Sequence, residues 1–234
     1  MTDEDKALPY QRGVGLLIWC LITRIDIAFA IGVLCRYMAK YNASLFILMK
    51  RVLRYLKGAS DFGLEYKRAT DKVKFSSNNI MDLVMYCDAD NASRVHDSRS
   101  TTSWFATLAG GIICFKSSIQ RPIALSTVES EFLALKDACQ EIEWLRALVQ
   151  EMSITIDGPT VVKQDNQSTI KLAINPVMHV KTKHFRVAQH YVRQLVKDGA
   201  IKPEYLETKL MSADLLNKAL SGPHFIRFRD IMMG

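Results

Sequence analysis

The sequence predicts an α/β protein in which a mixed β-sheet carries helices on its faces and follows a small helical segment. Three short segments rich in β-branched and aromatic residues stand in the middle of the chain, and strand patterns then alternate with helical patterns. Before them, residues 10–57 carry apolar residues at helical spacing. The expected order after the helical segment is therefore β-β-β-α-β-α-α-β-α.

Three consecutive antiparallel strands are the simplest interpretation of the middle of the chain. Their sequences are "LVMYCD" (83–88), "STTSWFATLA" (100–109) and "IICFKSSI" (112–119), with a glycine pair as the last turn. The elements expected after them are a helix from Ser126 to about Met152, a strand at 161–165, a short helix from Asn166, a basic amphipathic helix at about 184–197, a strand at 201–206 and a last helix in "SADLLNKAL", stopped by "SGP".

The domain organisation follows from composition. With 234 residues, about half of them apolar, the chain can form one large or two small domains. Residues 67–82 have few apolar side chains and are expected to be a linker or hairpin. We therefore expect a helical domain at residues 1–66 and the α/β domain at residues 83–234.

Charge and cysteine content narrow the class of protein. Lys and Arg number 31 and Asp and Glu 24, and the resulting charge of +7 favours a polyanionic partner such as nucleic acid, or else a solvated basic surface. Five cysteines without a CxxC pair are expected to be reduced, which indicates an intracellular protein, cytoplasmic or nuclear. Arg24 and Asp26 interrupt the longest apolar stretch, so no membrane partner is expected.

The segment "LSTVESEFLALKD" (125–137) places two glutamates at the start of a helix. If Ser126 is the N-cap, Glu129 can reach back to the backbone N–H of the cap. Glu131 instead lies at the edge of the buried face, about 60° from Val128 at 100° per residue. Burial of that carboxylate costs several kcal/mol unless a metal ion, or a salt bridge to Lys or Arg, compensates it.

Three aspartates stand at the ends of other predicted elements. Asp88 and Asp165 end strands, and if these strands are parallel neighbours, both carboxylates lie at the carboxyl edge of the sheet, where such folds bind ligands. Each aspartate at a helix start has an alternative role, Asp165 as an N-cap and Asp214 as an acid of the first turn. Carboxylates gathered at one place would suit two Mg²⁺ or Mn²⁺ ions, which can promote phosphodiester hydrolysis.

Six segments of the sequence match the pattern of a known family. They are "YCDAD", "ALSTVESEFLAL", "EIEWLRALVQEM", "KQDNQSTIKLAINP", "HVKTKHFRVAQHYVRQLV" and "SADLLNKAL". In this order and spacing they resemble the ribonuclease H domain of copia-type retrotransposon Pol polyproteins. The upstream segments "TRIDIAFAIGVL" and "MKRVLRYLKGASDFGLEY" resemble the end of the preceding reverse transcriptase region, so residues 1–66 would be its helical remnant.

The resemblance implies a ribonuclease H-like five-stranded mixed sheet with helices on both faces. It makes Asp88, Glu131, Asp165 and Asp214 both the catalytic residues and the ligands of two Mg²⁺ or Mn²⁺ ions. The implied activity is endonucleolytic hydrolysis of the RNA strand of RNA–DNA hybrids. The hybrid is then the expected partner, together with the missing reverse transcriptase portion of the polyprotein.

The basic stretch before and within the amphipathic helix is expected to contact the phosphate backbone. Its residues are Lys181, Lys183, His184, Arg186 and Arg193. Two departures from the family pattern, Met85 and Asn91, affect the packing beside Asp88, and no loop histidine precedes Asp214. The chain also lacks the YxDD-type aspartate pair of reverse transcriptases, so DNA synthesis is not expected. The alternative to a nuclease is a catalytically silent nucleic-acid-binding remnant.

Overall fold

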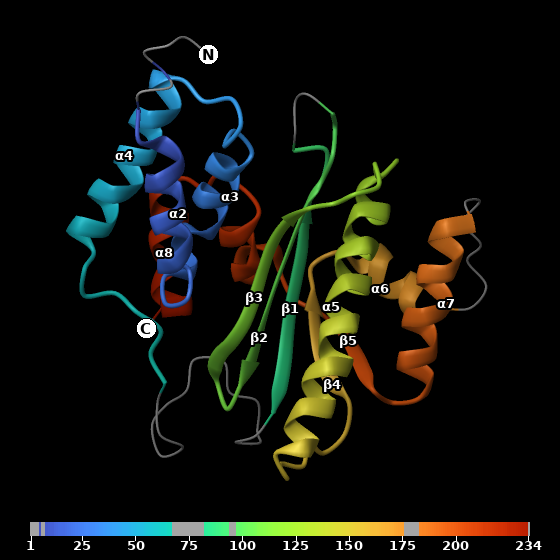
Figure 1. Ribbon diagram of the computed structural model, residues 1–234. Helices are drawn as coiled ribbons and strands as arrows, with labels where there is room; N and C mark the ends of the chain where they lie inside the picture. The colour runs from blue at the N-terminus through green and yellow to red at the C-terminus, as the bar shows by residue number, and fades with distance from the viewer. Residues whose placement is uncertain (1–4, 6–7, 67–81, 94–96, 176–182, 234) are drawn as a thin grey trace. The chain divides into compact units, whose positions relative to one another are not determined.

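A computed structural model describes residue 5 and residues 8–66, 82–93, 97–175 and 183–233 of the chain (Figure 1). The chain divides into two compact units. Unit 1 contains Met1–Glu65 and Ala219–Gly234, and unit 2 contains Tyr66–Lys218. All but the last residue of the linker or hairpin expected at 67–82 lies outside the described residues.

Unit 2 is built on a five-stranded mixed sheet with the strand order β3-β2-β1-β4-β5. Its strands are β1 (Leu83–Asp90), β2 (Thr101–Leu108), β3 (Gly111–Ile119), β4 (Thr160–Gln164) and β5 (Ile201–Tyr205). The β1–β2 and β2–β3 pairs are antiparallel, as predicted, and the β1–β4 and β4–β5 pairs are parallel. The predicted parallel relation between the strands that carry Asp88 and Asp165 is therefore correct.

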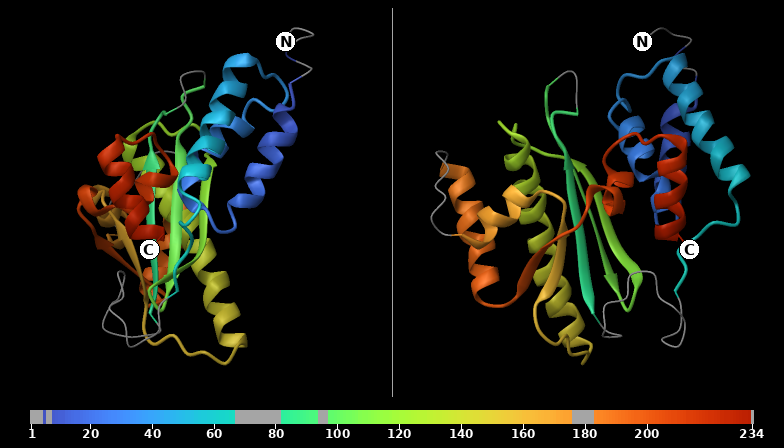
Figure 2. Two further views of the ribbon diagram at one scale, coloured as in Figure 1. Left: turned by 90° about the vertical axis from the view of Figure 1, so that its left-hand side faces the viewer. Right: turned by 180° about the vertical axis from the view of Figure 1, so that it is seen from behind.

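Within unit 2, three α-helices pack on one face of this sheet and a short 3-10 helix contacts the other, so helical elements lie on both faces as the family resemblance implies (Figures 1 and 2). The helices of unit 2 are α5 (Thr127–Glu151), α6 (Gln167–Ile174), α7 (Lys183–Lys197) and the 3-10 helices η2 (Thr208–Leu210) and η3 (Ser212–Leu216). The three α-helices share one core with inward residues of the sheet such as Cys87 and Trp104. Neighbouring residues along a strand point to opposite faces, so Asp88 points to the other face, where η3 contacts β1 and β2.

Unit 1 is helical. Its elements are α2 (Tyr10–Cys20), η1 (Ile25–Ile27), α3 (Ala28–Cys35), α4 (Ala43–Gly58) and α8 (Gly222–Met233). Its core includes Tyr10, Val14 and Met49. Gly13 allows α2 to approach α4 closely, because a Cβ atom at this position would lie 2.3 Å from Sδ of Met49.

The C-terminal part of the chain differs from the prediction. The segment "SADLLNKAL" contains a five-residue 3-10 helix, η3, instead of an α-helix. The "SGP" at 221–223 does not end the helical structure, because Gly222 and Pro223 form the first turn of α8. Proline is tolerated in a first turn, where its missing N–H would have no partner within the helix.

Helix α8 packs with unit 1, although residues 83–234 were expected to form a single domain. The ring of Phe225 meets that of Tyr55 edge-on, with 5.7 Å between the ring centroids. The guanidinium of Arg229 lies 4.1 Å from the centroid of the Phe62 ring. Aromatic and cation–π contacts to α4 and the segment after it thus hold the end of the chain. Within the described ranges, no helix combines the length and apolar character needed to cross a bilayer.

Candidate metal centre

Asp88 and Asp165 reach the same edge of the sheet because of the register between β1 and β4. The parallel pairing joins Tyr86 to Lys163, so each aspartate lies two residues beyond this pair. β1 continues to Asp90, whereas β4 ends at Gln164. The carboxyl ends of the two parallel strands therefore present both carboxylates at matching positions.

Glu131 lies in the first turns of α5, with its carboxylate close to these two aspartates, and it is only 4% exposed. Its Oε2 accepts a hydrogen bond from Nε2 of Gln164, at 3.2 Å. Glu129 has the other role: its Oε2 accepts from the backbone N–H of Leu125, at 2.8 Å, one residue before the predicted partner. Ser126 caps the helix as predicted, since its side chain accepts from the N–H of Glu129. The helical wheel thus identified the inward glutamate correctly.

The alternative role of Asp165 as a helix cap is wrong. The N-cap of α6 is Asn166, whose Oδ1 accepts from the backbone N–H groups of Ser168 and Thr169 at 3.0 and 3.1 Å. The carboxylate of Asp165 instead accepts a hydrogen bond from Oγ1 of Thr208, at 2.9 Å. The carboxylate of Asp165 is therefore not engaged in capping α6 and can act at the edge of the sheet.

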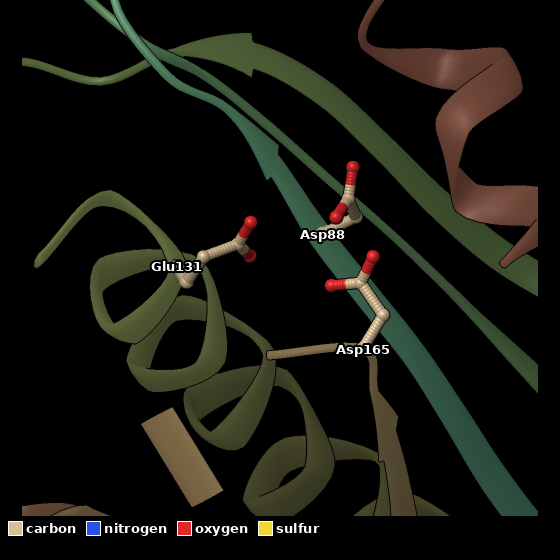
Figure 3. A group of neighbouring side chains, drawn as sticks. All are labelled: Asp88, Glu131 and Asp165. Carbon is tan, nitrogen blue, oxygen red and sulfur yellow. The ribbon is translucent and has the colours of Figure 1, made fainter. Parts of the chain in front are cut away.

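The carboxylate oxygens of Asp88, Glu131 and Asp165 lie within 4.8 Å of one another. Figure 3 shows the three side chains pointing toward a common space from β1, α5 and the end of β4. In the described part of the chain, neither Glu131 nor Asp165 forms an ion pair with Lys or Arg. An all-oxygen set of converging carboxylates fits a hard divalent cation such as Mg²⁺ or Mn²⁺.

Asp214 lies beside this group, but it is not one of the three clustered residues. It is 5% exposed, and its Oδ1 lies 2.6 Å from Nζ of Lys218. The same Nζ is 4.0 Å from Oδ2 of Asp88. The structure thus brings three of the four predicted acids together in one cluster, and it places the fourth, Asp214, against both Lys218 and Asp88.

Burial and the repulsion between neighbouring carboxylates raise the pKa values of Glu131, Asp165 and Asp214 in the metal-free protein. Burial, followed by the charges of Asp88 and Asp165, raises the pKa of Glu131 to about 10. Burial, followed by the charge of Asp88, also raises the pKa of Asp165. Burial, followed by a hydrogen bond with Asp88 and its charge, raises the pKa of Asp214 to about 8. A divalent cation would favour the ionised carboxylates and so act in the opposite direction.

Three residues of the site were not predicted from the sequence. Gln164 supports Glu131, while Asn217 donates to Oδ2 of Asp88 at 2.6 Å and to Oγ of Ser103 at 2.9 Å. Lys218 is the third. The spacing of four between Asp214 and Lys218 is a known ion-pair spacing on helices and was the one available signal.

The predicted nucleic-acid contacts are only partly described. Lys181 lies outside the described residues, and Lys183 and His184 are described only as part of the backbone of α7. Arg186 is exposed, whereas Nε of Arg193 donates to the carbonyl oxygen of Leu172 at 3.0 Å, which connects α7 to α6. Of these five residues, Arg186 is the one whose described side chain faces solvent.

The two departures near Asp88 have different surroundings. Met85 is fully buried in the core shared by the sheet and its α-helices. Asn91 is partly exposed, and its Oδ1 accepts from Oγ of Ser100 at 3.3 Å. Neither side chain is one of the three clustered carboxylates.

The strand order, the strand directions and the helices on both faces define a ribonuclease H-like fold. The chain is 33% identical over 236 residues to the retrovirus-related Pol polyprotein from transposon TNT 1-94 of Nicotiana tabacum, in an alignment that covers 99% of this chain and 17% of the relative. Over nearly its whole length the chain is homologous to Pol polyproteins of copia-type retrotransposons. A second such relative, from transposon RE2 of Arabidopsis thaliana, is 32% identical over 227 residues, which are 97% of this chain and 15% of that protein. The chain thus spans about a sixth of the length of these two relatives.

A smaller relative is the secreted RxLR effector protein 161 of Plasmopara viticola, 38% identical over 141 residues, which cover 60% of this chain and 93% of that protein. The solved structure of LC11-RNase H1 in complex with an RNA/DNA hybrid aligns with 58% of this chain and 94% of that one, at 14% identity and a TM-score of 0.44. The solved structure of the foamy viral protease-reverse transcriptase in complex with an RNA/DNA hybrid aligns with 95% of this chain and 29% of that one, at 14% identity and a TM-score of 0.44. No family model matches the chain.

Proposed function

We propose that unit 2 is a divalent-metal-dependent endonuclease that hydrolyses the RNA strand of RNA–DNA hybrids. The observation that carries this proposal is the convergence of Asp88, Glu131 and Asp165 within 4.8 Å. Burial without a cationic partner is costly for a carboxylate, and Glu131 has neutral hydrogen-bonding partners, the amide of Gln164 and the backbone of Ala89. Homology to retroelement Pol polyproteins supports a nucleic-acid substrate.

The side chains of unit 2 would have separate roles in binding metal and in orienting the metal ligands. Asp88, Glu131 and Asp165 would hold one ion, and Asp214 with Asp88 a second. A pair of Mg²⁺ or Mn²⁺ ions, when bound, supplies the charge that activates water and stabilises the leaving oxygen of a phosphodiester. Gln164 and Asn217 fix the orientations of Glu131 and Asp88 through hydrogen bonds. Preorganised ligands of this kind reduce the rearrangement needed when substrate binds.

The basic character of the chain supports binding of a hybrid duplex. Its charge of +7 favours phosphate contacts, which supply most sequence-independent affinity. Arg186 is an exposed candidate for such a contact on α7. The strand to be cleaved would be distinguished by its 2′-hydroxyl groups, which a protein can read along the minor groove. All five cysteines are free thiols, which supports our proposal of an intracellular location.

The test is cleavage of a hybrid labelled on its RNA strand, with the purified full chain in Mg²⁺ and in Mn²⁺. We expect RNA cleavage by the wild-type protein and a loss of at least about 100-fold in Asp88→Asn and Glu131→Gln, since each removes one charged ligand. Glu129→Gln is the matched control, because it makes the same chemical change two residues away on the same helix. This control should retain cleavage.

A second candidate function is a catalytically silent nucleic-acid-binding module. The observation that favours it is the ammonium group of Lys218, which already lies 2.6 Å from Asp214 and 4.0 Å from Asp88. Binding of the hybrid by folded wild-type protein, without RNA cleavage in either metal, would support this module and reject the nuclease.

For unit 1 we propose the helical end of a reverse transcriptase region, with the reverse transcriptase portion of the polyprotein as its partner. Exposed apolar residues on α2 and in the turn after it support this proposal: Leu16 is 62%, Trp19 75% and Ile22 67% exposed. The spacing of three between Leu16 and Trp19 places these two on one side of the helix. Co-expression with the reverse transcriptase portion of a relative should protect α2 from hydrogen exchange, and unchanged exchange would argue against this partner.

A further inference from the structure

Lys218 lies where two acids of the candidate metal centre face each other. Its Nζ is 2.6 Å from Oδ1 of Asp214 and 4.0 Å from Oδ2 of Asp88, and its side chain is 33% exposed. Lys218 is the second residue after η3, and its backbone N–H donates to the carbonyl oxygen of Asp214 at 3.3 Å. The local helical turn therefore returns the lysine to the acid four residues before it.

Asn217 fixes the acid on the other side of this lysine. Its Nδ2 donates to Oδ2 of Asp88 at 2.6 Å and to Oγ of Ser103 at 2.9 Å, and Asn217 is fully buried. Oδ2 of Asp88 thus faces Asn217 and Lys218. The carboxylate of Asp88 is shared between these two residues and the cluster with Glu131 and Asp165.

When all four acids of this arrangement are ionised, their charges do not balance without an external cation. Four carboxylates come from Asp88, Glu131, Asp165 and Asp214, and Lys218 is the one basic side chain within 4.0 Å of any of them among the described residues. A second divalent ion that bound between Asp88 and Asp214 would have to approach the ammonium group closely. Like charges about 4 Å apart repel strongly in a partly buried site.

On the basis of the metal-dependent function proposed above, we propose that Lys218 competes with the second divalent ion. Its ammonium group neutralises Asp88 and Asp214 in the resting protein, so that a first ion binds at Asp88, Glu131 and Asp165 while a second must displace the lysine side chain. Binding of the second ion is thereby weaker than binding of the first. The partial exposure of Lys218 gives the side chain a way out toward solvent.

Titration calorimetry of the full chain with Mn²⁺ tests this proposal. We expect the wild-type protein to bind one ion tightly and the second at least about tenfold more weakly. Lys218→Met keeps an unbranched apolar stem without the charge, and it should tighten the second ion about tenfold or more while leaving the first within a few-fold. Lys116→Met is the matched control: Lys116 is also half-buried and paired with a carboxylate, Asp137, at 2.7 Å. It should change neither ion.

Thermal unfolding supplies a readout that a purely structural lysine would not produce. In the metal-free state Lys218→Met removes the one described cation beside Asp88 and Asp214, so the midpoint should fall, and Mn²⁺ should restore most of the loss. If Lys116→Met lowers the unfolding midpoint, Mn²⁺ should not restore it. If Lys218→Met fails to fold, the double variant Asp214→Asn/Lys218→Met removes both charges of the pair and should bind a single ion.

The outcomes separate this proposal from the nuclease proposal. Two ions of equal affinity in the wild-type protein, or an unchanged second ion in Lys218→Met, would overturn the role of Lys218 and leave the nuclease in place. Two ions in the double variant would also overturn it. No Mn²⁺ binding by folded wild-type protein would reject the metal centre itself and the inference with it.

Discussion

Unit 1 and unit 2 both bury charged side chains, but they compensate the charge differently. In unit 1, Arg24 and Asp26 are 7% and 3% exposed and form a two-point ion pair, with Nε to Oδ1 at 3.0 Å and Nη2 to Oδ2 at 2.7 Å. The remaining groups are also satisfied, because Nη1 donates to the carbonyl oxygen of Ala59 and Tyr55 donates to Asp26. The buried charges of unit 1 therefore cancel within the protein.

In unit 2, a single lysine lies beside two of the four acids, and the other two have no cationic partner among the described residues. The raised pKa values of Glu131 and Asp214 express this imbalance. A buried pair that is complete has a structural role, whereas a buried group of acids that lacks cations is suited to bind them. The same degree of burial thus has opposite meanings in the two units.

The largest effect should come from breaking the complete pair. Arg24→Met leaves the carboxylate of Asp26 buried without its cation, and we expect a loss of about 3–5 kcal/mol in the unfolding free energy of unit 1. Urea unfolding with hydrogen exchange read in α2 and α4 measures this loss. Arg54→Met, at an exposed position of α4, should change stability by less than about 0.5 kcal/mol. Equal effects of the two substitutions would contradict the comparison.

The incomplete group should make unit 2 sensitive to pH when metal is removed. Between its usual pKa and its raised value of about 10, Glu131 in the folded protein holds a proton that the unfolded chain has released. Asp214 behaves in the same way up to about 8. Stability should therefore fall as pH rises from about 5 to about 8, by up to about 1.4 kcal/mol per pH unit for each group.

Unfolding in EDTA at several pH values measures this trend in unit 2, and Mg²⁺ should remove or reverse it because the ion favours ionised acids. Unit 1 provides the internal control, since its buried charges are paired. A metal-free unit 2 whose stability stays level across this range would show that the acids are better compensated than their surroundings indicate.

Glu131→Gln should stabilise the metal-free protein at about pH 8, because the amide needs no proton to remain neutral. We expect a gain of roughly 1–3 kcal/mol in unit 2, together with the loss of stabilisation by Mg²⁺. Denaturant unfolding with and without Mg²⁺ measures both changes. Glu129→Gln is again the control, and destabilisation by Glu131→Gln in EDTA would mean that Glu131 has an essential structural partner.

The smallest effects should come from substitutions of two glycines in α2, which test packing and not charge. Gly13→Ala places a Cβ atom 2.3 Å from Sδ of Met49 and should cost about 1 kcal/mol, since the flexible methionine can move aside. Gly15→Ala meets no atom within 4 Å and should stabilise α2 by about 0.5–1 kcal/mol. Thermal unfolding should show shifts of opposite sign, and shifts of the same sign would contradict the close approach of α2 and α4.

The parts of the site that follow from local rules could be predicted from the sequence. Helical periodicity and the capping box separate Glu131 from Glu129, because both depend on residues within one or two turns. The common edge of Asp88 and Asp165 required only that two strands be parallel neighbours. The register that joins Tyr86 to Lys163 then places these acids level with each other.

The remaining features depend on geometry that residue patterns do not determine. The N-cap of α6 is Asn166, one residue after Asp165, so the carboxylate of Asp165 is not used as a helix cap. The positions of Asn217 and Lys218 depend on the short turn η3 and on its contact with β1, far away in the sequence. Helix α8 was missed because Gly222 and Pro223, a usual stop signal, here begin a helix that tertiary contacts stabilise.

The discontinuity of unit 1 has a consequence for biosynthesis. Its two segments, Met1–Glu65 and Ala219–Gly234, are separated by the whole of unit 2. On the ribosome, the residues of the sheet emerge before α8 exists, so unit 2 can acquire its tertiary structure during translation, while α2, α3 and α4 pack with one another and η1 still lacks its contacts with α8. The contacts of α8 with Tyr55 and Phe62 can form only after about 150 further residues have been translated, so this part of unit 1 is completed last.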